Sequence, residues 1–371
     1  MKWRILLLAL IGATLLIAAS CEGNKNADCE DCPEDDLIGG SYSPMPYNLE
    51  IPAWMPTPFI PADNPLTKEG VALGRRLFYD PILSSDGSMS CASCHQQEKA
   101  FTDGQAKSPG VLGILGKRSS MSLANLAFNT SGLFWDGRSA TLEEQALLPV
   151  EDHVELNENW SNVEEKLRKH QEYPILFRQA FGIDKKSQIT RNLAVKAIAQ
   201  FERTLVSGNS KYDRVVWLNE GWFTDEEERG RQLFFFEPAY PNHPGCSHCH
   251  FNPLFTDNNF HNNGLDAVSN LDAFADAGRG VVTKNRFDNG KFRVPTLRNV
   301  ELTAPYMHDG RFQTLEEVLD QYATGGHGVE NENPNIIAFP LTEQQKQDLI
   351  AFLKALTDTS FVNNPSFSKP F

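Results

Sequence analysis

Two short motifs constrain this chain more than any other feature, Cys91–His95 (CASCH) and Cys246–His250 (CSHCH). In a Cys-x-x-Cys-His motif the two thiols reach the two vinyl groups of one porphyrin, and the adjacent His becomes the proximal ligand of the iron. A zinc site would need a second ligand pair nearby, and a thioredoxin-like redox pair needs no trailing His. The two copies begin 155 residues apart, so coincidence explains them poorly. The sequence therefore predicts two covalently bound haem c groups, attached at Cys91, Cys94, Cys246 and Cys249 and ligated by His95 and His250.

The N-terminal residues have the pattern of an export signal, and haem c is attached outside the bacterial cytoplasm. Lys2 and Arg4 precede an apolar run, residues 5–19, that is too short to span a bilayer comfortably. Small residues then lead into Cys21, as at a lipoprotein cleavage site. We therefore predict a signal peptide over residues 1–20 and a periplasmic protein held on a membrane by lipid at Cys21. Ordinary cleavage into the periplasm is the alternative.

Residues 21–50 are acidic, contain Gly, Asn, Ser and Pro, and lack hydrophobic periodicity, which predicts a flexible tether. Cys29 and Cys32 lie here without a following His, so they cannot form a third haem site. In an oxidising compartment a local disulfide is favoured over metal binding. The sequence leaves the role of Cys29 and Cys32 open.

The rest of the chain repeats one pattern twice. Residues 67–78 end thirteen residues before Cys91, and residues 224–234 end twelve residues before Cys246. Each stretch begins with Thr and acidic residues and then carries apolar side chains on one face, which predicts a capped helix. Amphipathic stretches over 189–205 and 341–356 predict a closing helix in each half.

Strand signals are weak, and the Gly-, Pro- and Asn-rich stretch 256–296 suits loops packed on haem. A helix, a haem motif, a long loop and a closing helix form the plan of a cytochrome c domain. We therefore predict a mainly α fold of two cytochrome c-like haem domains, residues 51–208 and 209–371, with a linker near Ser207–Tyr212.

Several further motifs resemble those of one known family. They are Phe134–Arg138 (FWDGR), Gln145, Pro149, Glu155, Val294–Asn299 (VPTLRN) and Pro305–Gly310 (PYMHDG). Together with the haem motifs, over about residues 52–356, they resemble the bacterial di-haem cytochrome c peroxidases and the related methylamine-utilisation enzyme MauG. The resemblance implies a peroxidatic haem in the N-terminal domain and an electron-transfer haem in the C-terminal domain.

The resemblance assigns site residues around the first haem. Glu155 matches the distal acid, which can take the proton of incoming peroxide and return it to the departing oxygen. Without the family pattern, the same carboxylate would be interpreted as a solvated charge in an acidic stretch. Gln145 and Pro149 match other residues of that pocket. Trp135 matches an aromatic that lies between the haems and can relay electrons, although a buried Trp alone is usually core.

The iron of the first haem is predicted to be open in the resting ferric state. In bacterial peroxidases a distal His in the matching loop usually blocks this iron until the second haem is reduced. Residues 109–118 contain no His, as in MauG-like members. Met121 is an alternative ligand, but Met on an apolar stretch is more often core.

The sixth ligand of the second haem is predicted to be Tyr322. In the family this ligand follows the His of the Pro-Tyr-x-His-Asp-Gly run by fourteen residues, and counting from His308 gives Tyr322. Peroxidases that take electrons from small cytochromes usually have Met there, whereas MauG has Tyr. A phenolate stabilises ferric iron and lowers the potential. Met307 is the competing ligand.

The family usually binds calcium between the haems, through an amide oxygen, backbone carbonyls and waters. Thr303 and Pro305 match the carbonyl donors. Ser119 stands at the amide position and lacks that carbonyl oxygen. A calcium ion is therefore an expectation that Ser119 weakens.

The net charge of −14 argues against a nucleic-acid partner and favours a basic protein partner. The implied partners are hydrogen peroxide and a small electron donor, a cytochrome c or a cupredoxin; a homodimer stays open. The leading function is reduction of peroxide to water with periplasmic electrons. The alternative is MauG-like oxidation of residues on a partner protein, which Tyr322 and the missing distal His favour. A non-enzymatic di-haem electron carrier is third, and Glu155 over an open iron counts against it.

Overall fold

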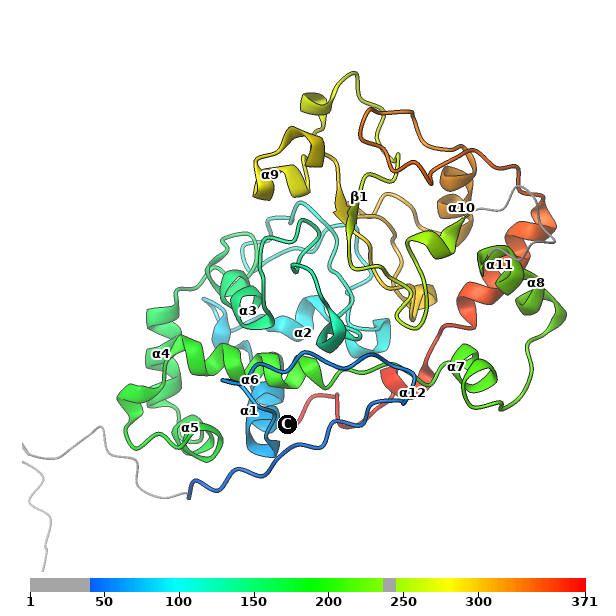
Figure 1. Ribbon diagram of the computed structural model, residues 1–371. Helices are drawn as coiled ribbons and strands as arrows, with labels where there is room; N and C mark the ends of the chain where they lie inside the picture. Colours follow the sequence, from blue (N-terminus) through cyan, green and yellow to red (C-terminus); the bar gives the residue numbers. More distant parts are fainter. Residues whose placement is uncertain (1–40, 236–244) are drawn as a thin grey trace, which may run out of the picture. The chain divides into compact units, whose positions relative to one another are not determined.

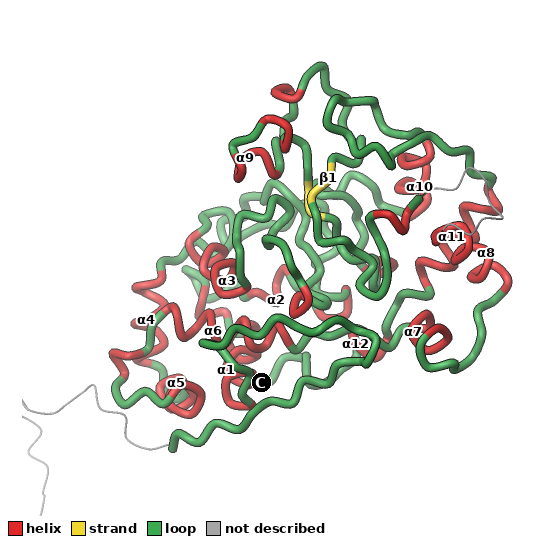
Figure 2. The backbone as a smooth tube through the Cα atoms, viewed as in Figure 1, coloured by secondary structure: helices red, strands yellow, loops and turns green. Residues whose placement is uncertain are grey.

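The computed structural model describes residues 41–235 and 245–371. The N-terminal half contains helices α1 (Lys68–Tyr79), α2 (Cys91–Cys94), α3 (Leu142–Glu151), α4 (Trp160–Lys169), α5 (Tyr173–Phe181) and α6 (Arg191–Arg203). The C-terminal half contains α7 (Lys211–Val216), α8 (Asp225–Phe235), α9 (Arg279–Thr283), α10 (Leu315–Ala323), α11 (Glu343–Lys354) and α12 (Thr359–Val362). Strands β1 (Phe260–His261) and β2 (Phe292–Arg293) pair antiparallel. Long loops connect these elements (Figure 2), and the predicted mainly α fold is confirmed.

Each half of the molecule is built on one pair of packed helices. Helix α1 packs on α6, and α8 packs on α11 (Figure 1). These four helices confirm the helices predicted around the two haem motifs. The first helix of each pair begins at a threonine cap: Thr67 Oγ1 accepts from the Gly70 N–H at 3.0 Å, and Thr224 Oγ1 accepts from the Glu227 N–H at 3.3 Å.

Each helix pair crosses at a glycine. A Cβ atom on Gly74 would lie 1.8 Å from the carbonyl oxygen of Ala197 on α6. A Cβ atom on Gly230 would lie 1.9 Å from the carbonyl oxygen of Asp348 on α11. Neither position has room for a side chain, so backbone meets backbone at both crossings. The internal repeat in the sequence is thus a repeat of this close helix contact.

Each half has its own hydrophobic cluster, and a third cluster joins them. The first is built on α1 and α3–α6, and the second on α8, α10 and α11. The third places Phe78, Phe101 and Phe201 of the N-terminal half against Phe361 and Phe367 near the C-terminus. The two helix pairs are therefore packed into one continuous unit rather than left separate.

The segment that connects the halves is buried and hydrogen-bonded. The Ser207 N–H and carbonyl both bond to the side-chain amide of Asn125. The Asp358 carboxylate accepts from the N–H groups of Gly208 and Asn209 at 3.0 and 2.9 Å. These bonds fix the path of the chain between the halves, while the domain boundary at 208/209 stays a prediction.

The C-terminal tail ends against the N-terminal half. Tyr79 Oη donates to the carbonyl of Phe367, and Arg75 Nε donates to the carbonyl of Ser368, each at 2.6 Å. The sequence groups these last residues with the C-terminal domain. In the structure they pack on α1.

The predicted signal peptide, the anchor Cys21 and the pair Cys29 and Cys32 lie outside the described residues. Across residues 41–235 and 245–371, no helix has the length and apolar character needed to cross a membrane.

The helix crossings lead to a stability prediction. Gly74→Ala should lower the free energy of unfolding of the haem-loaded protein by a net amount of roughly 1–2 kcal/mol. The methyl group must push α1 away from α6, which outweighs the roughly 1 kcal/mol that Ala gains in helix propensity. Urea unfolding followed by circular dichroism measures the loss. Gly116→Ala is the control, because its Cβ would meet nothing closer than 3.6 Å. Equal stabilities of the two variants would contradict the crossing.

Candidate functional site

The first Cys-x-x-Cys-His motif is one helical turn that ends at its histidine. Helix α2 holds Cys91 and Cys94 half-buried, and the His95 N–H bonds to the Cys91 carbonyl at 3.0 Å. His95 Nδ1 donates to the carbonyl of Phe101 at 2.9 Å. This bond leaves Nε2 as the ring nitrogen that can bind an iron. Burial lowers the pKa of His95, so the imidazole is kept neutral, as a metal ligand must be.

The second motif repeats this arrangement. The His250 N–H bonds to the Cys246 carbonyl at 2.9 Å, and His250 Nδ1 donates to the carbonyl of Phe255 at 3.0 Å. Phe255 and Phe101 both have positive φ, +55° and +63°, which turns their carbonyls back toward the histidine. Burial also lowers the pKa of His250. Neither phenylalanine stands out in the sequence.

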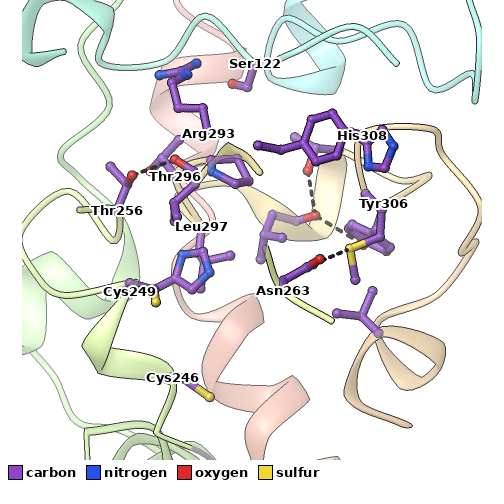
Figure 3. Close-up of a pocket in the computed structure, with 18 of the residues that line it drawn as sticks. Ser122, Cys246, Cys249, Thr256, Asn263, Arg293, Thr296, Leu297, Tyr306 and His308 are labelled. Carbon is purple, nitrogen blue, oxygen red and sulfur yellow. Dashed lines mark hydrogen bonds between the residues drawn. The ribbon is translucent and has the colours of Figure 1, made fainter. Parts of the chain in front are cut away.

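A cavity of about 250 Å³ lies beside the second motif. Figure 3 shows Cys246, Cys249, Asn263 and Arg293 around it. Much of its lining is apolar and comes from Phe234, Leu254, Leu297, Val300, Leu315, Leu319, Leu349 and Leu353. Such walls suit a flat apolar cofactor that is held by a few polar contacts.

The surroundings of Arg293 indicate whether an anionic cofactor fits this cavity. Its side chain is buried, with the residue 7% exposed. Nη1 donates to Asn129 Oδ1 at 3.1 Å, Nη2 faces Met121 Sδ at 3.6 Å, and Nε has no partner among the described residues. Burial lowers the pKa of Arg293 to about 10. A buried cation without a counter-ion is costly. A haem propionate would supply the carboxylate, so the residues present fit haem.

Both candidates for the sixth ligand of the second haem line the same cavity. Asn263 Nδ2 donates to Tyr322 Oη at 3.2 Å and to Met307 Sδ at 3.6 Å. Burial raises the pKa of Tyr322, so its phenol stays neutral unless a cation such as iron displaces the proton. Because both residues line the cavity and both contact Asn263, the choice of Tyr322 over Met307 as ligand stays a prediction.

Glu155 lies in the turn after α3, beside the first motif. Its charge acts on the thiols of both Cys91 and Cys94, which places the carboxylate near the predicted haem. Burial, followed by the nearby Asp152, raises the pKa of Glu155 to about 7, while Arg138 acts in the opposite direction. A carboxyl group with this pKa can both accept and release a proton near neutral pH.

The loop that lacks a histidine packs on the backbone of Glu155. The Val111 N–H donates to the Glu155 carbonyl at 2.8 Å. A Cβ atom on Gly110 would lie 2.2 Å from the Val154 carbonyl oxygen, so the two backbones meet directly. Gln145 lies on α3, where Pro149 also stands inside the helix. The structure thus gathers the predicted pocket residues around the end of α3, and their roles stay predictions.

Trp135 connects the two halves at the cavity. Its Nε1 donates to the Ser119 carbonyl at 2.9 Å, and its carbonyl accepts from the Arg293 N–H at 2.8 Å. The side chain lines the same cavity as His250. This position is compatible with an electron relay between the haems, which remains a prediction.

The three predicted calcium ligands, Ser119, Thr303 and Pro305, also line this cavity. Ser119 Oγ donates to the Met307 carbonyl at 3.0 Å, and the Ser119 N–H donates to the His308 carbonyl at 2.9 Å. The Ser119 carbonyl is taken by Trp135. Calcium stays a prediction, and the hydroxyl and carbonyl of Ser119 already have hydrogen-bond partners.

A buried ion pair behind the second motif was not expected from the sequence. Arg298 and Asp213 are both 0% exposed and share two hydrogen bonds of 2.7 and 2.8 Å. Arg298 Nε also donates to the Pro253 carbonyl at 2.8 Å. The pair ties the Val294–Asn299 motif and α7 to the chain that follows His250. Its partners are 85 residues apart, so no local pattern could reveal it.

Comparisons with known proteins agree with this geometry. A sequence model described as di-haem cytochrome c peroxidase matches residues 68–220. The methylamine utilization protein MauG of Methylorubrum extorquens is 38% identical over 301 residues, which cover 80% of either chain. The cytochrome-c peroxidase IdrP1 of Pseudomonas sp. (strain SCT) is 38% identical over 326 residues, 80% of this chain and 83% of the relative.

A solved structure is also similar, that of a MauG-like protein associated with microbial copper homeostasis. It shares 35% identity with a TM-score of 0.81, over 87% of this chain and 99% of the other. Together with the two Cys-x-x-Cys-His sites, these relationships make two haem c groups the cofactors of this protein. The chain belongs to the family of di-haem cytochrome c peroxidases and MauG.

Proposed function

We propose that this protein reduces hydrogen peroxide to water at its first haem, with electrons that pass through the second haem from a periplasmic donor. The donor is a small cytochrome c or a cupredoxin. The observation that carries this proposal is Glu155, a partly buried carboxyl group with a pKa raised to about 7 beside the first motif. Each peroxide takes two electrons and two protons and yields two water molecules.

Side chains of the protein carry out the proton transfer. The haem iron supplies the redox chemistry of O–O cleavage when it is bound. Glu155 accepts the proton from one peroxide oxygen and returns it to the departing oxygen. The hydrogen bond from the Val111 N–H fixes the backbone from which this side chain extends. Gln145 shapes the same pocket, and Trp135 relays electrons between the two sites.

The location of the enzyme is inferred from its covalent haem and from its N-terminal sequence. We place it in the periplasm, where haem is attached covalently, and we propose a lipid anchor at Cys21. A calcium ion near Ser119, Thr303 and Pro305 and a homodimer belong to the same proposal. None of these is needed for the role of Glu155.

Peroxide consumption with a reduced small cytochrome tests the proposed function. The wild-type protein should oxidise two donor molecules per peroxide, and Glu155→Gln should slow turnover by roughly 10²- to 10⁴-fold. The wild-type rate should fall as the pH drops through about 7, because the carboxyl group must be ionised to accept the proton. Glu151→Gln, an exposed acid at the end of α3, is the matched control. Equal rates for both variants, or no donor oxidation at all, would contradict the proposal.

A second candidate function is oxidation of side chains on a partner protein. Tyr322 in the cavity of the second motif favours it, because an anionic phenolate stabilises ferric iron and disfavours a high-potential donor. A non-enzymatic electron carrier fits less well. Such a carrier has no use for a proton-transferring acid such as Glu155 beside the first motif.

Replacement of Tyr322 distinguishes the two enzyme functions. If its phenolate binds the second haem, Tyr322→Met should raise the potential of that haem and change its ferric spectrum. Turnover with a high-potential cytochrome should increase, while peroxide binding at the first haem stays the same. Spectroelectrochemical titration measures the potential. Met307→Leu is the comparison: loss of the native spectrum in this variant, with none in Tyr322→Met, would assign the ligand to Met307.

A further inference from the structure

Asn263 stands between the two possible sixth ligands of the second haem. Its Nδ2 atom lies 3.2 Å from Tyr322 Oη and 3.6 Å from Met307 Sδ. A side-chain amide nitrogen carries two hydrogens, so it can donate to the oxygen and to the sulfur at once. One side chain therefore contacts both atoms that compete for the iron.

The backbone around Asn263 is held on both sides. The preceding Asn262 is 2% exposed, and its side-chain amide donates to Asn331 Oδ1 at 2.8 Å. The backbone carbonyl of the following Gly264 accepts a hydrogen bond from Gln321 Nε2 at 3.2 Å. Gln321 directly precedes Tyr322 on α10, so this bond ties the Asn263 segment to the helix that carries the predicted ligand.

Gly264 also packs the segment that carries Asn263 closely against the end of α10. Its φ is +69°, and a Cβ atom there would lie 2.6 Å from the Cα atom of Gly326. Gly326 follows α10 closely, so the loop and the end of the helix touch backbone to backbone. The amide of Asn263 is thus presented to Tyr322 by a fixed scaffold rather than by a free loop.

We propose that Asn263 is a positioning residue that sets the potential of the second haem through a hydrogen bond to the Tyr322 oxygen. This inference rests on the proposed ligation by Tyr322 and is independent of peroxide as substrate. Hydrogen bonds to a ligating atom tune the metal as the ligand itself does. A bond from Asn263 withdraws negative charge from the phenolate oxygen. The oxygen then stabilises ferric iron less, and the potential is higher than with an unbonded tyrosinate.

The second hydrogen of the amide has a separate consequence. It engages Met307 Sδ, the softer and competing donor. Asn263 thereby contacts both of the atoms that compete for the iron. One uncharged side chain therefore contacts both donors that compete at the second haem.

Removal of the amide from the intact di-haem protein tests the proposal. Asn263→Leu removes both donors at similar volume, and Asn263→Asp keeps the shape while replacing the NH₂ group by an acceptor. Both variants should lower the midpoint potential of the second haem and shift its ferric absorption and electron paramagnetic resonance signals. The first haem should keep its spectrum. Asn270→Leu, an exposed asparagine in the same loop region, is the control and should change neither.

The outcomes separate the inference from its premise. An unchanged potential and spectrum in Asn263→Leu would show that the amide only completes the loop, and would overturn the proposal. If Tyr322→Met also left the second haem unchanged, the ligation by Tyr322 itself would be wrong. Peroxide consumption, which reports on Glu155, is measured separately and does not enter either result.

Discussion

The hydrogen bond from each motif histidine to a phenylalanine carbonyl is the interaction on which both sites depend. Thioether bonds hold only the edge of a porphyrin, so the imidazole direction decides where the iron and its other face lie. Phe101 and Phe255 are 0% exposed and belong to the hydrophobic clusters beside the two helix pairs. The two phenylalanines thus pack against the helix pairs that cross at Gly74 and Gly230.

The two motifs have the same local structure, but different residues lie beside them. At the first site, burial gives Glu155 a pKa of about 7, and the adjoining loop offers no histidine. At the second, Tyr322 and Met307 both meet Asn263. Arg293 lies between, buried and without a carboxylate among the described residues. These differences support our proposal that the first site transfers a proton on a small substrate and that the second holds an electron at a set potential.

Sequence patterns were sufficient where the determinants are local. The threonine caps and apolar periodicity predicted α1, α6, α8 and α11, and the Cys-x-x-Cys-His spacing predicted both attachment sites. Sequence patterns were insufficient where two interacting residues lie far apart in the sequence. Arg298 and Asp213 are 85 residues apart, and Asn263 and Tyr322 are 59 apart. The fold alone brings such pairs together, and the family motifs mark Arg298 without revealing what it binds.

In our proposal the iron of the first haem is open to peroxide in the resting protein, and Glu155 transfers the proton. Rapid mixing of the fully ferric di-haem protein with hydrogen peroxide tests it most directly. We expect a prompt change of the Soret band without any prior reduction, because residues 109–118 contain no histidine that could block the iron. A reaction that begins only after the second haem has been reduced would show that another ligand occupies the first iron, and that the resting site is closed.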